Sequence, residues 1–482
     1  MKCCRGWFLN ALLAGAVLGL AHCEDSSGGG GDATPDSDAV VVDGDAGGDA
    51  TTGPGDAAAA DGGAADAAPD PRPALYPTDR THSPITPYVA ARLADVLAVN
   101  PNSQRDVFMK VGDSISASDA FLDCFAGTSV DLAAYSALQP ALDYFLTTPV
   151  GATTSFDRDS YVVESGRTAY WAVTGSPSPL TSEMSASDPA AAVVMFGTND
   201  IGWFGSDHVL TLQWYYDHYL ELVDTLVAAG IVPILSTIPP RDDSASEDAW
   251  VPMLNAMIRG VAQGHQIPLV DYHRELLPLA DHGLSGDGVH PTAYYNPTAQ
   301  ACVFTPAGLL YGYNLRNLIT LEALDRVRAA ALDGSTPPDL QAPHRIGLGT
   351  ATAPYVIDTA LYTHLGNTAD STARNLSFYG GCGSGADESG PEILYELTLA
   401  LPARVRAMVF DVGDVDVDIH LLDDTASEAG CLARGDTLVE MDLSPGTYHF
   451  SLDTYVSGGV EWAGEFLFVV LVCEAGVPGC DG

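Results

Sequence analysis

The chain has few basic residues and almost no lysine. Its 482 residues include 20 lysines and arginines against 63 aspartates and glutamates, which gives a net charge of −43. Proteins that hold nucleic acid by its phosphates need a basic surface, so this composition disfavours nucleic acid as a partner. The acidic surplus favours solubility outside the cell.

The sequence lacks a typical transmembrane segment at its N-terminus. The apolar stretch at residues 7–21 is shorter than the roughly 20 residues that a bilayer-spanning helix needs. It follows two basic residues, which is the order of a secretory signal peptide. Leu20-Ala21-His22-Cys23 resembles a bacterial lipobox, in which the cysteine receives a lipid, although His22 is not the small residue usual there.

These features predict a signal peptide at residues 1–23 and lipidation of Cys23. The protein is then exported, either as a cell-envelope lipoprotein or as a secreted protein. Contact with a membrane is expected only through the N-terminal lipid anchor. Cleavage by an ordinary signal peptidase is the alternative.

Cysteine patterns for metal binding are missing as well. The sequence has no C-x-x-C and no Cys/His cluster with zinc spacing, so we expect no structural zinc. Of nine cysteines, three lie at or before Cys23; of the other six, two lie in the first folded region and four in the second, an even number in each. This division suggests disulfides made in an oxidising compartment. Our hypothesis pairs Cys124 with Cys302, Cys382 with Cys431, and Cys473 with Cys480.

Composition divides the chain into segments. Residues 24–73 are almost wholly Gly, Ala, Asp, Ser, Thr and Pro, and cannot bury enough apolar surface to offset the entropy of ordering. We expect a disordered acidic linker there, which acts as a tether. A first folded domain is predicted over residues 74–334, a short Ser/Pro-rich linker over 335–345, and an accessory domain over 346–482.

The first domain alternates between strand-like and helix-like segments, which is typical of a doubly wound α/β domain. Apolar runs predict parallel strands, and apolar spacing of three and four residues predicts helices. The expected strands are 107–111, 190–196, 231–238 and 267–270, and the expected helices are 207–229, 249–260 and one within 306–332.

The second domain has a different pattern. Short segments of alternating polarity, separated by Gly, Pro and Asp, predict an antiparallel β-sandwich. These segments are 393–401, 405–412, 415–422, 446–455 and 464–472. The region loosely resembles the bacterial pre-peptidase C-terminal type of β-domain through Asp414-Val415-Asp416-Val417-Asp418 and Pro445-Gly446-Thr447-Tyr448. The three alternate aspartates are expected to share one sheet face, where three carboxylates are able to bind calcium. A solvated face is the alternative that we favour, and we predict no metal.

Three short blocks carry the chemistry. Each follows a predicted strand, where open α/β sheets collect their active-site residues. They are Gly112-Asp113-Ser114, Gly197-Thr198-Asn199-Asp200 and Asp287-Gly288-Val289-His290. A serine needs a base to become a nucleophile, so we predict that His290 activates Ser114 and that Asp287 orients His290.

Attack on an ester carbonyl creates an oxyanion that needs hydrogen-bond donors. The Ser114 backbone N–H and the Asn199 side chain supply two of them. Taken alone, each block also fits a structural role. Ser114 and Asn199 are residue types that often cap the N-terminus of a helix, and a lone histidine usually has no catalytic role. The three in order favour catalysis, with His282 as the alternative base.

The blocks resemble those of the GDSL or SGNH hydrolases, with Ser114, Asn199 and the Asp287/His290 pair matching three of the four family blocks over roughly residues 85–332. The resemblance implies a flavodoxin-like three-layer α/β/α fold and hydrolysis of carboxylic esters without a cofactor. It also implies a glycine in the oxyanion hole, for which we favour Gly166 over Gly175.

The sequence does not fix the substrate. Lipids, O-acetylated polysaccharides and small acyl esters present the same carbonyl, and export together with the β-domain gives a mild preference for an extracellular polysaccharide ester. The competing hypothesis is a non-catalytic surface binding or adhesion protein in which the β-domain carries the function.

Overall fold

The structure, a computed structural model, describes residues 71–334 and 337–474. The predicted signal peptide, the lipidation site Cys23 and nearly all of the acidic linker lie outside the described residues, as does Cys480. Within the described residues, no helix has both the length and the apolar character needed to cross a membrane.

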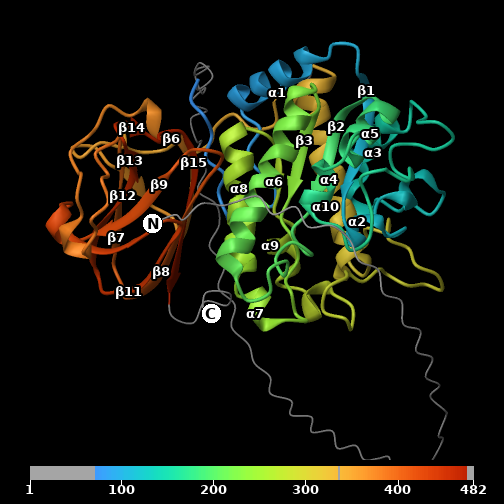
Figure 1. Cartoon of the computed structure of the whole chain (residues 1–482). Helices are drawn as coiled ribbons and strands as arrows, with labels where there is room; N and C mark the ends of the chain where they lie inside the picture. The colour runs from blue at the N-terminus through green and yellow to red at the C-terminus, as the bar shows by residue number, and fades with distance from the viewer. Residues whose placement is uncertain (1–70, 335–336, 475–482) are drawn as a thin grey trace, which may run out of the picture. The chain divides into compact units, whose positions relative to one another are not determined.

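A four-stranded parallel sheet forms the centre of the first part of the chain (Figure 1). Its strands follow one another in the order β1-β2-β3-β4. They are β1 (Gln104–Gly112), β2 (Pro189–Met195), β3 (Val232–Ser236) and β4 (Leu269–Val270). Every residue of β2 and β3 is buried, which explains why these strands read as continuous apolar runs in the sequence.

Helices cover both faces of this sheet, as in a three-layer α/β/α fold (Figure 1). Phe108 of β1 and Phe145 of α3 pack edge to face, with ring centres 5.5 Å apart. The helices are α1 (Pro87–Val99), α2 (Ser114–Ala117), α3 (Gln139–Phe145), α4 (Ala169–Val173), α5 (Pro179–Ser187), α6 (His208–Ala228), α7 (Ala245–Asp248), α8 (Val251–His265), α9 (Tyr272–Leu276) and α10 (Gly312–Val327).

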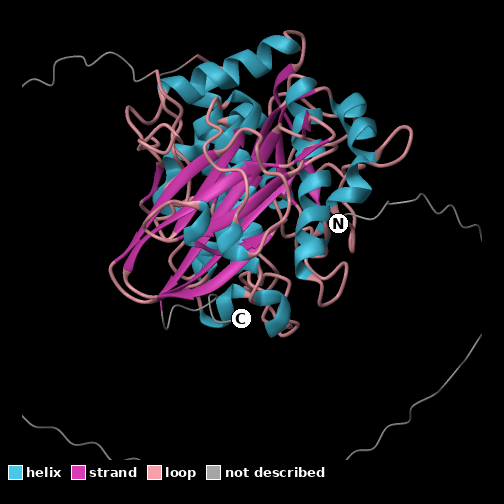
Figure 2. Ribbon diagram, turned by 60° about the vertical axis from the view of Figure 1, so that its left-hand side comes forward, coloured by secondary structure: helices cyan, strands magenta, loops and turns pink. Residues whose placement is uncertain are grey.

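The C-terminal part is an all-β region of two stacked sheets around a second hydrophobic core (Figure 2). The sheet orders are β10-β9-β12-β7-β5 and β11-β8-β15-β6, beside a small β13-β14 hairpin. The strands are β5 (Tyr355–Ile357), β6 (Leu361–Asn367), β7 (Ile393–Leu399), β8 (Ala403–Asp411), β9 (Val417–Leu422), β10 (Cys431–Gly435), β11 (Leu438–Leu443), β12 (Gly446–Thr454), β13 (Val456–Ser457), β14 (Val460–Glu461) and β15 (Glu465–Glu474).

The predicted fold class is therefore confirmed, with two corrections in the β region. The sandwich is not wholly antiparallel, because β5 pairs with β7 in parallel. The aspartates at 414, 416 and 418 do not share one strand face, because β9 begins only at Val417. Among the described residues, no group of three or more acidic, histidine or cysteine side chains is placed to hold a metal ion.

Helix α8 packs against the β region. A side chain at Gly260 would approach Leu467 of β15 to 2.6 Å, and one at Gly264 would approach Leu365 of β6 to 2.3 Å. The two glycines, four residues apart, thus form a flat stripe on which the sheet rests. Gln263, on the same helix, donates a hydrogen bond to the backbone oxygen of Thr363 at 3.0 Å.

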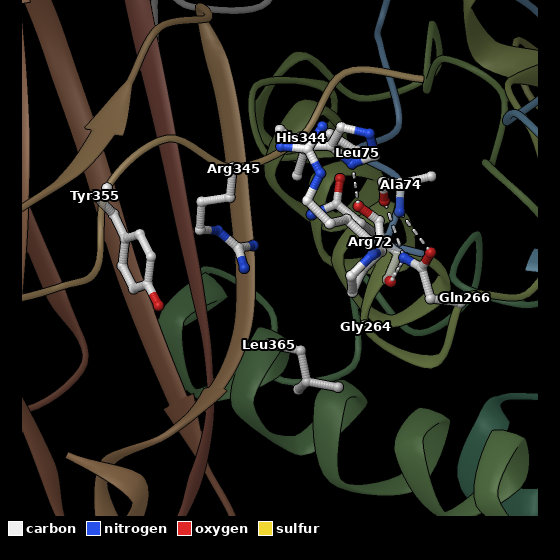
Figure 3. A pocket seen from close by; sticks show the side chains of 12 residues that line it. Arg72, Ala74, Leu75, Gly264, Gln266, His344, Arg345, Tyr355 and Leu365 are labelled. Atoms are coloured by element: carbon white, nitrogen blue, oxygen red, sulfur yellow. Dashed lines mark hydrogen bonds between the residues drawn. The ribbon is translucent and has the colours of Figure 1, made fainter. Parts of the chain in front are cut away.

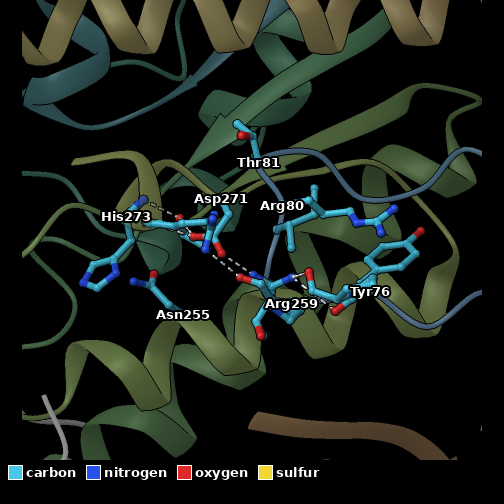
Figure 4. Close-up of polar contacts among 12 residues, drawn as sticks. Tyr76, Arg80, Thr81, Asn255, Arg259, Asp271 and His273 are labelled. Carbon is cyan, nitrogen blue, oxygen red and sulfur yellow. Dashed lines mark hydrogen bonds and ion pairs between the residues drawn. The ribbon is translucent and has the colours of Figure 1, made fainter. Parts of the chain in front are cut away.

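A buried polar network fastens the segment before α1 to the sheet (Figure 4). The Arg259 guanidinium of α8 forms an ion pair with Asp271, which follows β4. It also donates hydrogen bonds to the backbone oxygens of Tyr76 and Pro77. Because Arg259 is only 4% exposed, these partners compensate a charge that would be costly to bury alone.

Two of the three expected disulfides lie within the described residues. Cys124 is bonded to Cys302 in the first region, and Cys382 to Cys431 in the β region. Both match the predicted pairing. The third expected pair includes Cys480, which lies outside the described residues. The division into domains at residues 334 and 346 stays a prediction.

Candidate active site

Ser114 lies at the carboxyl end of β1, as predicted, and is the first residue of α2. Asp113 caps this short helix, since its side chain accepts a hydrogen bond from the Ile115 N–H at 3.0 Å. A side chain at Gly112 would meet the backbone oxygen of Met195 at 2.7 Å, so only glycine lets β1 turn this close to the end of β2. Ser114 itself is half-buried.

A buried arginine supports α2 from behind. Arg316 of α10 is 2% exposed and donates hydrogen bonds to the Ile115 backbone oxygen at 2.7 Å and to the Ser116 hydroxyl at 2.8 Å. Its guanidinium carbon lies 3.6 Å from the ring centre of Phe121. These contacts fix the turn that presents Ser114. Sequence reasoning missed Arg316, because a lone arginine in a helix carries no motif.

The loop after α9 brings the other two predicted residues to Ser114. His290 Nε2 lies 2.8 Å from Ser114 Oγ, and His290 Nδ1 lies 2.7 Å from Asp287 Oδ2. A carboxylate can only accept, so the proton on the imidazole sits on Nδ1 and donates to Asp287. Nε2 is then free to accept the Ser114 proton, which is the arrangement of a serine-hydrolase triad.

Asp287 is itself held by a tight turn. Its Oδ1 accepts hydrogen bonds from the His290 N–H at 3.0 Å, the Val289 N–H at 3.0 Å and the Ser285 hydroxyl at 2.7 Å. These donors, with the His290 N–H the strongest, hold the pKa of Asp287 well below its usual value. The carboxylate therefore stays ionised while it orients the imidazole. Half of its side-chain surface is exposed, so the triad opens to solvent.

Asn199 faces the segment that contains Gly166. Its side-chain amide donates a hydrogen bond to the Arg167 backbone oxygen at 3.0 Å, which leaves the second amide hydrogen for another acceptor. Gly166 adopts a left-handed conformation with φ of 77° and is exposed. Gly166 directly precedes Arg167, whereas Gly175 lies beyond the far end of α4. The role of Gly166 as the oxyanion glycine stays a prediction.

A second arginine missed by sequence reasoning supports the Asn199 loop. Arg241 donates to the Thr198 backbone oxygen at 2.5 Å, and forms ion pairs with Asp243 and with Glu247 of α7. Gly197 adopts φ of 132°, and a side chain there would approach Leu254 of α8 to 2.8 Å. The loop is thus held from both sides.

Two buried carboxyls lie beneath the site. Burial raises the pKa of Asp113 to about 6 and that of Asp200 to about 8. Asp200 Oδ1 accepts a hydrogen bond from the Ala169 N–H at 2.9 Å, which ties the Asn199 loop to the start of α4. The charge of Asp113 further raises the pKa of Asp200. At neutral pH, Asp200 is therefore largely protonated.

His282, the alternative base, has a different partner. Its Nδ1 lies 2.9 Å from Asp242 Oδ1, and no hydrogen bond joins it to Ser114 within the part of the chain that the structure describes. The geometry thus favours His290 as the base.

A cavity of about 330 Å³ lies away from the triad, between α8 and the β region (Figure 3). The residues that line it include Gln266, Arg345, Tyr355 and Leu365, and none of the predicted catalytic residues lines it. The chemistry assigned to Ser114 therefore does not belong to this cavity.

Residues 111–294 match the family model of the GDSL-like lipase/acylhydrolase family. This segment contains Ser114, Gly166, Asn199, Asp287 and His290. Residues 111–294 form a GDSL-like lipase/acylhydrolase domain. The family match supports hydrolysis of carboxylic esters by this domain. No curated protein matches the sequence.

The solved structures that match parts of this chain have low sequence identity to it. A GDSL-like lipase from Bacteroides thetaiotaomicron is 16% identical, with a TM-score of 0.30, over 49% of this chain and 98% of that one. A two-domain esterase active on acetylated mannans is 13% identical, with a TM-score of 0.29, over 82% and 97%. The pre-peptidase C-terminal domain of a Bacillus anthracis collagenase is 13% identical, with a TM-score of 0.16, over 23% and 87%.

Proposed function

We propose that the protein is an exported serine esterase that works through an acyl-serine intermediate. Ser114 Oγ attacks the ester carbonyl carbon while His290 Nε2 takes the hydroxyl proton. Asp287 stabilises the resulting imidazolium. The tetrahedral intermediate collapses, and the alcohol leaves with the proton from His290. Water then attacks the acyl-serine by the same route and releases the acid.

The oxyanion is held by three N–H donors in this proposal. They are the backbone N–H of Ser114, the backbone N–H of Gly166 and the second side-chain N–H of Asn199. A preorganised donor of this kind contributes about 10²- to 10³-fold in kcat. The observation that carries the proposal is the 2.8 Å contact between His290 Nε2 and Ser114 Oγ, made while Nδ1 is held by Asp287.

We further propose that the ester is an O-acyl group on an extracellular polysaccharide. The side chains of His290 and Asp287 are 41% and 51% exposed, which lets a bulky polymer reach the nucleophile. The two disulfides suit an oxidising location such as the cell exterior.

The test is hydrolysis of 4-nitrophenyl acetate, butyrate and octanoate, together with release of acetate from acetylated xylan and mannan. Wild-type protein is expected to prefer acetate, and Ser114→Ala is expected to lose all of these activities. Activity that persists in Ser114→Ala contradicts the proposed nucleophile. A wild-type protein inactive on every substrate favours the binding-protein hypothesis instead.

A further inference from the structure

A cluster of aromatic side chains lies on the surface beside the Asn199 loop. Helices α4 and α6 run side by side there (Figure 1). We name this the aromatic cluster; it contains Tyr170 of α4, Trp203 and Phe204 of the loop before α6, and Trp214 and His218 of α6.

Trp214 is the centre of the aromatic cluster. The Trp203 ring stacks on it with centres 5.1 Å apart and planes 4° from parallel. Tyr170 lies 5.5 Å from Trp214, and Phe204 lies 5.9 Å from it at nearly a right angle. Trp214 thus supports one face of the Trp203 ring, while Tyr170 and Phe204 contact Trp214 at an angle. Even so, Trp203 remains 50% exposed, Tyr170 42% and Phe204 40%.

The loop that carries Trp203 is well ordered by its own contacts. The Trp203 N–H donates to the Asp200 backbone oxygen at 2.9 Å, and the Phe204 N–H donates to the Thr211 hydroxyl of α6 at 3.3 Å. Ile201 is fully buried and anchors the loop in the core. Exposed rings that are already fixed lose little entropy when they bind a ligand.

The aromatic cluster is continuous with the catalytic machinery. Trp203 lies four residues after Asn199, so their Cα atoms are at most about 14 Å apart. Tyr170 directly follows Ala169, whose N–H is bound by Asp200, and belongs to the segment that begins at Gly166. A ligand lying on these rings therefore passes close to the oxyanion side of the site.

We propose that the aromatic cluster is a subsite for an uncharged polysaccharide chain, whose sugar rings stack on Trp203 and Tyr170 while a nearby O-acyl group reaches Ser114. This inference rests on the proposed function and identifies the alcohol side of the ester. Sugar rings offer apolar C–H faces that suit flat aromatic surfaces, and hydroxyl edges that stay in water. The net charge of −43 disfavours polyanionic chains and anionic membranes.

The test compares acetylated substrates of different length on the full chain. The kcat and KM are measured for acetylated xylohexaose and mannohexaose, and for acetylated monosaccharides and 4-nitrophenyl acetate as short substrates. Because stacking stabilises substrate and transition state alike, Trp203→Ala is expected to raise the KM for the hexasaccharides about 10-fold with kcat retained. Trp203→Phe keeps a ring and is expected to restore most of the affinity. In both Trp203 variants, the activity on 4-nitrophenyl acetate is expected to stay at the wild-type level.

The control is Phe378→Ala, which removes a ring 52% exposed in the β region and is expected to change no parameter. Unchanged KM for the hexasaccharides in Trp203→Ala overturns the subsite. An equal loss of kcat on all substrates in both Trp203 variants also overturns it, because the ring would then shape the catalytic loop.

A binding measurement separates this inference from the proposed reaction. Calorimetric titration of Ser114→Ala with unacetylated xylohexaose and mannohexaose needs no catalysis. Binding that disappears when Trp203→Ala is added supports the subsite even if the esterase assays fail. Absence of oligosaccharide binding, with Trp203-dependent binding to phosphatidylcholine vesicles, overturns it in favour of a lipid surface.

Discussion

The Arg406 guanidinium of β8 lies 4.1 Å from the ring centre of Trp250, just before α8. It also donates to the Ala249 backbone oxygen at 3.0 Å and pairs with Glu440. Ala249 directly follows α7, whose Glu247 forms an ion pair with Arg241, and Arg241 in turn donates to the Thr198 backbone oxygen. The β region thus contacts the support of the Asn199 loop.

Removing this contact is expected to weaken both stability and catalysis. Arg406→Ala should lower the free energy of unfolding by about 1–3 kcal/mol, since a buried cation–π contact and a hydrogen bond are lost. It should also lower kcat on 4-nitrophenyl acetate several-fold.

Arg404→Ala is the matched control. Arg404 lies on the same strand and binds the same Glu440, but it is 39% exposed and its ion pairs should contribute less than about 1 kcal/mol. Urea unfolding and steady-state kinetics compare the two variants. Equal effects would show that Arg406 acts only as a surface charge.

The role of Asp287 is tested by Asp287→Asn. The amide can donate to Nδ1, which moves the imidazole proton to Nε2 and leaves no acceptor for the Ser114 hydroxyl. We expect kcat to fall about 10²- to 10⁴-fold with little change in KM. Asp281→Asn, an exposed carboxylate of the same loop, should stay near wild type. If Asp287→Asn keeps most of its kcat, Asp287 does not orient His290.

The buried Asp200 predicts a pH dependence of stability. Its pKa is about 8 in the folded protein, against an ordinary value near 3.8. Between these pH values the folded state keeps a proton that the unfolded chain releases, so this residue lowers the free energy of unfolding as pH rises. Below about pH 4 both states are protonated and this destabilisation is absent.

Asp200→Asn removes this titration while an amide oxygen still accepts from Ala169. Its stability relative to wild type should rise from pH 4 to pH 8, by at most about 1.4 kcal/mol per pH unit. Asp95, on α1, has a side chain that is 69% exposed. The free energy of unfolding of Asp95→Asn should therefore differ from that of wild type by the same amount at every pH. Urea unfolding at several pH values measures both. A constant offset for Asp200→Asn would mean that Asp200 is ionised in the folded protein.

The two disulfides should differ in their contribution to stability. Cys124 and Cys302 are separated by 178 residues, and Cys382 and Cys431 by 49. Replacing either pair by serine should cost about 2–5 kcal/mol, and the chain-entropy account makes the longer loop about 1 kcal/mol more costly. Unfolding of the two double variants measures the difference. The reverse order would contradict this account.

The sequence predicted those helices and strands that are determined by residues close together in the chain. Strands β2 and β3 are buried on both faces and so read as apolar runs, and α6 has its aspartate cap at Asp207 and a glycine after its end. Helix α8 was expected to end at Gly260 but continues to His265. Gly260 lies within it to make room for Leu467, a contact between regions that no local pattern shows.

The candidate site follows the same division. Ser114, Asn199, Asp287 and His290 stand in short blocks with recognisable spacing, so they were predicted. Three arginines that support the site donate hydrogen bonds to backbone oxygens of residues distant in the sequence; they are Arg241, Arg316 and Arg406. A single arginine outside a motif does not indicate such a contact in the sequence. The sequence analysis also missed six strands of the β region, which are β5, β6, β10, β11, β13 and β14.

Covalent trapping tests the central claim most directly. Diethyl 4-nitrophenyl phosphate reacts with an activated serine: the oxygen bonds to phosphorus, 4-nitrophenolate leaves, and the proton passes to the base. We predict one diethylphosphoryl group per full-length chain by intact mass, located on Ser114 by peptide mapping, and none in Ser114→Ala. An esterase-active protein that carries the group on another residue, or carries none, would contradict the account.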